Sequence, residues 1–118
     1  MINSHKDLIV WQKSIELVEE IYKLTRKFPK SEIYGLSSQM QRAAVAIPSN
    51  IAEGAKRGHR AEYTQFVSIA NGSAAELETQ LILTRRLFPK LNTIRAIGLT
   101  EEVLKMLHVM LHSLKQKS

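Results

Sequence analysis

The spacing of apolar residues in four stretches constrains the fold of this chain more than any other feature. Apolar side chains recur three and four positions apart, which is typical of amphipathic α-helices. The first stretch carries two adjacent stripes of this kind, Leu8, Trp11, Ile15, Val18 and Tyr22 in one and Leu17, Ile21, Leu24 and Phe28 in the other. No stretch shows sustained alternation of apolar and polar residues, so we expect no β-strand. The chain is therefore predicted to be all-α.

Helix signals between these stretches set the predicted bounds. We predict helices over about residues 7–28, 34–55, 61–87 and 100–116. Asp7 suits the N-cap of the first helix, Pro29 marks its end, and Thr100 suits the N-cap of the last. Because the linkers are short, consecutive helices should run antiparallel as an up-down-up-down four-helix bundle. We expect one domain over residues 1–118.

The stretch over residues 36–60 is unusual for a plain bundle helix. It is rich in small side chains, at Ala43, Ala44, Ala46 and Ala52. Another helix could therefore approach closely, while Pro48 should bend the helix or free the carbonyl of Ala44. Gly72, in the third predicted helix, costs about 1 kcal/mol of helix propensity. We expect a close backbone approach there to be its reason.

Charge is unevenly distributed along the predicted bundle. The chain has 17 Lys and Arg against 11 Asp and Glu, a net charge of +6. The end with the first and third linkers has eight basic and three acidic residues, and the opposite end has six basic and three acidic residues. The middle of the bundle, which we call the waist, has three basic and five acidic residues. Positive ends on a negative waist favour a polyanionic partner, nucleic acid first.

Few residues are arranged for catalysis or metal binding. With no cysteine, disulfides, thiolate metal sites and cysteine nucleophiles are excluded. His108 and His112 stand four apart, which would let two imidazoles share a metal, but their helix offers no third ligand. Residues 54–59 hold glycines and basic residues without the spacing of a phosphate-binding loop. We expect no metal, no cofactor and no enzyme; a metal-binding bundle enzyme is the least favoured alternative.

Four polar residues lie nearest the predicted inner faces of the second and third helices: Arg42, Asn50, Glu53 and Glu76. In a structural network, Arg42 would pair with Glu76, within one subunit or between two, and Glu53 would cap the third helix. The alternative is a ligand or partner site. We favour the structural network, because buried charges need partners whatever else they do.

Two segments also carry a family resemblance. QMQRAAVAIPSNIAEGAKRG (residues 39–58) and FVSIANGSAAELETQLILTRRL (residues 66–87) resemble the family of proteins encoded in 23S ribosomal RNA intervening sequences. Accessory proteins of diversity-generating retroelements are relatives of this family. Ala46 departs from the pattern, where a serine is expected. The resemblance implies an antiparallel four-helix bundle that assembles into a homopentamer, without enzymatic activity, and whose basic surface binds nucleic acid.

We therefore predict a non-catalytic homo-oligomer that binds RNA or another nucleic acid without strong sequence specificity. The residues expected to contact phosphates are Lys23, Arg26, Lys27, Lys30, Arg85, Arg86 and Arg95 at one end and Lys56, Arg57 and Arg60 at the other. Aromatic residues are missing among them, which argues against base stacking. The alternative function is a protein-interaction scaffold that binds no nucleic acid.

Two further expectations concern assembly and location. The stripe from Leu17 to Phe28 could face a neighbouring subunit or, equally, could be ordinary core. The N-terminus lacks the apolar segment of a signal peptide, and no apolar run approaches the ~18 residues that span a bilayer. We expect a cytoplasmic protein without a membrane partner.

Overall fold

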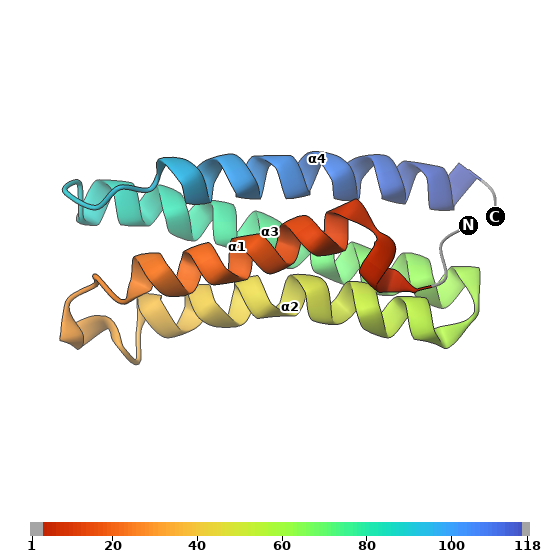
Figure 1. Cartoon of the computed structure of the whole chain (residues 1–118), viewed down its shortest axis with the longest axis horizontal. Helices are drawn as coiled ribbons and strands as arrows, with labels where there is room; N and C mark the ends of the chain where they lie inside the picture. The colour runs from red at the N-terminus through yellow and green to blue at the C-terminus, as the bar shows by residue number, and fades with distance from the viewer. Residues whose placement is uncertain (1–3, 117–118) are drawn as a thin grey trace.

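Four long helices make up a computed structural model that describes residues 4–116 (Figure 1). They are α1 (Ile9–Thr25), α2 (Leu36–Arg57), α3 (Arg60–Leu87) and α4 (Ile94–Gln116), with short 3₁₀ helices η1 (His5–Asp7) and η2 (Lys30–Glu32) on either side of α1. The molecule measures 45 × 21 × 20 Å, and the helices follow its long axis. Residues 4–116 contain no strand, and the all-α prediction is confirmed.

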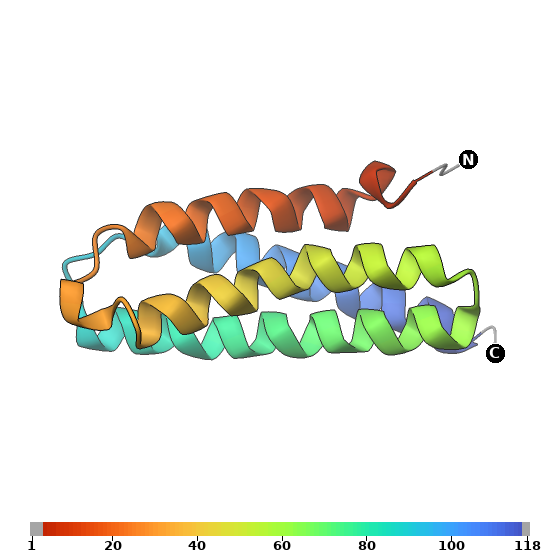
Figure 2. The ribbon, with the colours of Figure 1, turned by 90° about the horizontal axis from the view of Figure 1, so that it is seen from below.

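The helices pack in chain order around one core. α1 contacts α2 and α4, and α3 contacts the same two helices from the opposite corner. Figures 1 and 2 show consecutive helices running in opposite directions, as predicted. The α1–α2 and α3–α4 linkers (residues 26–35 and 88–93) therefore share one end, which we call the linker end. The α2–α3 turn lies at the other end, the turn end.

The two apolar stripes of α1 have different environments. Leu17, Ile21, Leu24 and Phe28 are at most 8% exposed and join the core. Of the two alternatives for this stripe, the structure therefore shows ordinary core and not a subunit interface. The other stripe is only partly buried and packs against the core edge at Leu8, Trp11 and Val18. The apolar surface of α1 comes from this second stripe and from Ile9, which is 64% exposed.

The last helix begins earlier than Thr100, and that prediction is wrong. α4 begins at Ile94, six residues before Thr100 and roughly 9 Å along the axis. The Asn92 Oδ1 accepts a hydrogen bond from the Ile94 N–H at 3.1 Å and so caps the helix. Thr100 is 1% exposed, and its Oγ1 donates to the Ala96 carbonyl at 2.7 Å. The extra turns bury Ala96 and Leu99, which stabilises an early start.

α1 is shorter at both ends than predicted. It begins at Ile9, after an extended Leu8, and Asp7 belongs to η1 instead of capping α1. It ends at Thr25, three residues before Phe28. There the chain tightens into i→i+3 bonds, Lys27 N–H to Leu24 O at 3.1 Å and Phe28 N–H to Thr25 O at 3.1 Å. This tighter turn brings Phe28 against Phe88, with ring centroids 5.2 Å apart, and closes the linker end of the core.

α2 and α3 approach closely at Gly54. A Cβ on Gly54 would lie 2.8 Å from the Phe66 Cβ and 3.0 Å from the Tyr63 Cδ1. Gly72 faces open space instead, with no heavy atom within 4 Å of such a Cβ, so the expectation of close approach there is wrong. Pro48 is buried inside α2, which continues past it as helix. Among the described residues, no helix is long and apolar enough to cross a membrane.

Candidate nucleic-acid interface

Exposed basic side chains gather at the linker end. They come from the C-terminal ends of α1 and α3 and from the α1–α2 linker: Lys23, Arg26, Lys27, Lys30, Arg85 and Arg86. None of the ion pairs formed within residues 4–116 involves them. Cations at helix C-termini also complement the helix dipole, which gives part of this cluster a purely structural role. Their charges nevertheless remain available to a polyanion.

Arg95 differs from its neighbours at this end. Its Nε lies 3.2 Å from Glu20 Oε1, and its Nη2 lies 3.6 Å from Glu16 Oε1. Lys13 continues the network at 3.8 Å from Glu16 and 3.7 Å from Glu102. The two Arg95 pairs and the Lys13–Glu102 pair link α1 to α4, so Arg95 acts first as a contact between helices. A phosphate would have to compete with two carboxylates for it.

The early start of α4 also changes the charge map. Glu101 and Glu102 lie beyond the first turn of α4 instead of at its N-terminus, which places them beside the acidic waist. The acidic residue left at the linker end is Glu32, whose Oε1 accepts a hydrogen bond from the Leu36 N–H at 3.1 Å. The linker end is thus more positive, and the waist more negative, than the predicted helix bounds implied.

The turn end offers a smaller basic surface. Arg57 is held by Glu53 at 3.1 Å and Glu62 at 3.7 Å, and its guanidinium lies 5.0 Å from the centroid of the Phe66 ring. Lys56 and Arg60 are exposed and absent from the ion pairs of the described chain. This end therefore has fewer available cations than the linker end.

The four residues of the predicted polar network do not form one cluster. Arg42 and Glu76 border the same surface groove between α2 and α3, yet no ion pair joins them in the described structure. Asn50 donates from Nδ2 to the Ala46 carbonyl at 2.8 Å. Glu53 pairs with Arg57, and α3 begins without a side-chain cap. Because Arg42, Glu53 and Glu76 are exposed, no burial forces them to pair.

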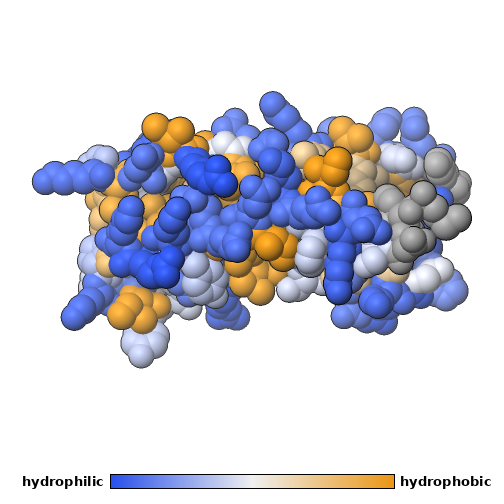
Figure 3. All heavy atoms as spheres, in the orientation of Figure 1, coloured by the Kyte–Doolittle hydropathy of each residue, from blue (hydrophilic) through white to orange (hydrophobic). Residues whose placement is uncertain are grey.

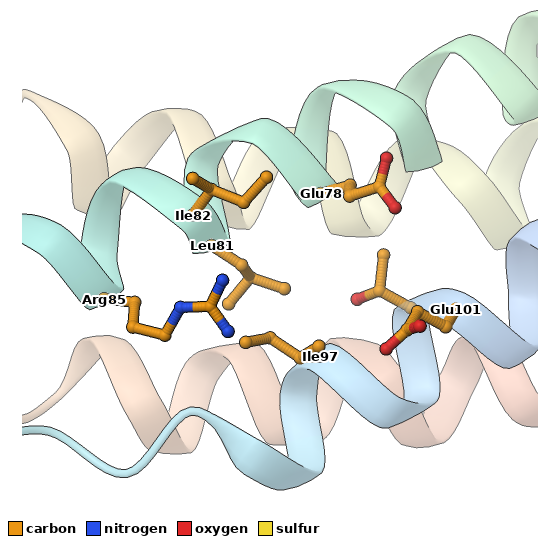
Figure 4. A pocket seen from close by; sticks show the side chains of 7 residues that line it. Glu78, Leu81, Ile82, Arg85, Ile97 and Glu101 are labelled. Atoms are coloured by element: carbon orange, nitrogen blue, oxygen red, sulfur yellow. The ribbon is translucent and has the colours of Figure 1, made fainter.

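A pocket of about 300 Å³ lies between α3 and α4 (Figure 4). Leu81, Ile82 and Ile97 supply its apolar walls, with Arg85 on one side and Glu78 and Glu101 on the other. The two carboxylates come from different helices. No ion pair links them to Arg85 among the described residues.

Metal-binding and acid–base groupings are few. His108 and His112 are both exposed on α4. Residues 4–116 hold no group of three or more His, Asp or Glu side chains that could bind a metal ion. Burial raises the pKa of Tyr63 above its ordinary value. Nothing in this part of the chain points to catalysis.

An apolar groove runs between α1 and α2 on the opposite side from the α3–α4 pocket. Trp11, Ile15 and Val18 line it from α1, and Val45, Pro48 and Ala52 line it from α2. Val45 remains 40% exposed. Figure 3 shows one face of the molecule, on which hydrophobic patches interrupt a largely hydrophilic surface. The buried Pro48 thus has a surface role as well, since its ring forms part of this groove.

One aromatic residue at the linker end was missed by sequence reasoning. Tyr34, in the α1–α2 linker, is 97% exposed and lies four residues after Lys30. A sequence signal was available: Ile33 and Tyr34 are adjacent apolar residues at the start of the helix predicted over residues 34–55, outside its apolar stripe. An exposed aromatic residue therefore lies at the basic linker end, where none was expected from the sequence.

The comparisons with known proteins give the family. The family of 23S rRNA-intervening sequence proteins matches residues 6–109. This chain belongs to that family. A crystal structure from Bacteroides thetaiotaomicron VPI-5482, of a protein of unknown function from the S23 ribosomal protein family, is similar to it. The similarity has a TM-score of 0.76 at 25% identity and covers 87% of this chain and 98% of that one. No curated protein matches the chain.

Family membership confirms the resemblance and agrees with the bundle. The function of that structural relative is unknown, so the function of this family member has to be argued from its own surface.

Proposed function

We propose that this intervening-sequence family protein is a non-catalytic homo-oligomer that binds RNA, or another nucleic acid, through its basic linker end. The observation that carries the proposal is the cluster of exposed cations there without ion-pair partners, above an acidic waist. Neutralising phosphates with such cations releases counterions, so binding should weaken steeply with salt. Because side chains at helix ends and linkers would contact phosphates, little sequence specificity is expected.

The two surface hollows support self-association. The α1–α2 groove and the α3–α4 pocket lie on opposite faces of the bundle, and both have apolar walls. Contact between unlike faces of two copies is heterologous and closes into a ring when the rotation allows it. A ring would bring several linker ends together and sum their fields. The homopentamer is the ring that the family resemblance implies.

The first test is size-exclusion chromatography with light scattering, with and without a short structured RNA, at low and high salt. The proposal predicts an oligomer that takes up RNA at low salt and releases it at high salt. An oligomer that ignores RNA at every salt concentration would exclude this function. A monomer that binds RNA would leave the nucleic-acid interface in place and remove the ring.

Charge reversal locates the interface. Arg85→Glu with Arg86→Glu should weaken RNA binding at low salt by at least about tenfold, because each lost phosphate contact lowers the affinity and the salt slope. The matched control is Arg42→Glu with Lys105→Glu, which makes the same change in net charge at exposed positions of the waist. Equal losses in the two double variants would mean that net charge, and not the linker end, governs binding. Circular dichroism checks that both variants remain helical.

A protein-interaction scaffold is the second candidate. The observation in its favour is the α1–α2 groove, which a different protein could occupy instead of a second copy. A scaffold predicts that the purified chain ignores RNA at low salt, whereas the nucleic-acid proposal requires uptake under those conditions.

A further inference from the structure

Tyr34 has an exposure that the fold does not explain. Its side chain is 97% exposed, and the adjacent Ile33 is 54% exposed. Phe28 and Phe88, at the same end, pack against each other, and Tyr22 on α1 is less exposed, at 42%. Figure 3 shows hydrophobic surface at the corner where the α1–α2 linker lies in Figure 1. No packing of the described chain requires an aromatic residue at this position.

The linker that carries Tyr34 is held by hydrogen bonds on both sides. The Ile33 N–H donates to the Lys30 carbonyl at 3.2 Å, and the Gly35 N–H donates to the Glu32 carbonyl at 3.1 Å. The Glu32 carboxylate accepts from the Leu36 N–H. A Cβ on Gly35 would lie 2.9 Å from that same Glu32 Oε1, so glycine leaves room for the contact. The backbone around Tyr34 is thus preorganised, and little ordering cost is left for binding.

Available cations lie on this linker and elsewhere at the same end of the bundle. Lys27 and Lys30 belong to the same connection, and Arg85 and Arg86 end α3 at the same end of the bundle. Exposed aromatic faces next to cations are the two components of sites for unpaired nucleic acid, because bases stack on the ring while phosphates meet the charges. A protein partner would explain the apolar tip but not the cations around it.

We propose that Tyr34 stacks on an unpaired base of the nucleic acid bound at the linker end, so that the protein prefers single-stranded or looped RNA over a continuous duplex. This inference rests on the proposed function. It adds a contact that the phosphates cannot supply, because every base presents a ring face and only an unpaired base leaves that face open.

The test compares binding of two RNA probes, a short oligouridine and a blunt duplex of the same length, to the full chain at low salt. Tyr34→Ala should weaken oligouridine binding by roughly 5- to 100-fold, the range for loss of one stacking contact. Duplex binding should change by less than about twofold, because phosphate contacts dominate it. Tyr34→Phe keeps the ring and should retain wild-type binding. Ile33→Ala is the control, since it removes the neighbouring exposed apolar side chain of the same linker without removing a ring.

The outcomes separate the two proposals. Wild-type protein that binds neither probe would overturn the proposed function and this inference together. If the wild-type protein binds both probes, two results for Tyr34→Ala would overturn the stacking role alone. One is wild-type affinity for both probes, and the other is an equal loss of affinity for both. A loss in Tyr34→Phe as large as in Tyr34→Ala would also overturn it, because the hydroxyl and not the ring would then make the contact.

Fluorescence gives an independent measurement of stacking. Trp11 is the only tryptophan, so a Trp11→Phe, Tyr34→Trp variant carries its single indole at the linker tip. Stacking predicts quenching on addition of oligouridine and little change with duplex. Binding without quenching would contradict a base on this side chain.

Discussion

Two glycines in neighbouring helices have opposite surroundings. Gly54 lies where α2 meets α3, and a methyl group there would come within 2.8 Å of the Phe66 Cβ. Gly72 lies on an exposed part of α3, where a methyl group would meet no heavy atom within 4 Å. The first glycine is required by close packing, whereas the second costs the helix propensity without a contact in return.

Alanine substitutions should therefore change stability in opposite directions. Gly54→Ala should lower the free energy of unfolding by about 1–3 kcal/mol, because α2 and α3 must separate or distort to fit the methyl group. Gly72→Ala should raise it by up to about 1 kcal/mol through helix propensity and a less flexible unfolded chain. Denaturant unfolding at one fixed protein concentration measures both. A stabilising Gly54→Ala would contradict the close approach.

At the scale of elements, the start of α4 shows how burial overrides a cap signal. Thr100 with two following glutamates resembles a helix N-terminus, yet the chain is already helical from Ile94. Asn92 supplies the cap, and the first turns bury Ala96 and Leu99. Thr100 then serves as an interior residue whose hydroxyl bonds back to its own helix.

Amide hydrogen exchange distinguishes the two starts. With α4 beginning at Ile94, the amides of Gly98, Leu99 and Thr100 have intrahelical partners and should exchange slowly. A helix beginning at Thr100 would leave these amides unprotected. Asn92→Ala should lower the stability by about 1 kcal/mol, a usual cost of losing a cap. Unchanged stability in Asn92→Ala together with fast exchange at Leu99 would contradict the structure here.

At the scale of the whole molecule, the bundle separates its surfaces by chemistry. Basic residues collect at the linker end, acidic residues at the waist, and apolar residues in the groove between α1 and α2. Under the proposed function, each surface makes a different contact: a polyanion, a paired cation and another apolar face. Arg95 and Lys13 already form such ion pairs between cations and the acidic residues of the waist within one chain.

If subunits meet at the α1–α2 groove, a charge placed in this groove should dissociate the oligomer. Val45→Glu places a charge at the edge of the α1–α2 groove, at a side chain that is 40% exposed, so the monomer should fold while a subunit contact there is lost. Val109→Glu, at a 67% exposed position on α4 that does not line this groove, is the matched control. Light scattering should show a lower mass for Val45→Glu alone. Equal masses for both variants and wild type would place the interface elsewhere.

The sequence alone determined the fold class, the number of long helices and their order. Helical periodicity is a local property, and short linkers leave antiparallel packing as the arrangement that buries all the apolar stripes. The family resemblance was equally local, because it depended on two continuous segments. The basic character of the linker end followed from topology and charge together, without any tertiary detail.

Only the tertiary structure showed which residues contact one another across different segments of the chain. Core placement of the Leu17 stripe depends on the three other helices, and the need for glycine at position 54 depends on Phe66 across the α2–α3 contact. The ion pairs of Arg95 join residues far apart in the chain. Tyr34 is 97% exposed, because no other part of the described chain covers it. Exposure, pairing and close approach are properties of neighbours in space, and one-dimensional spacing does not contain them.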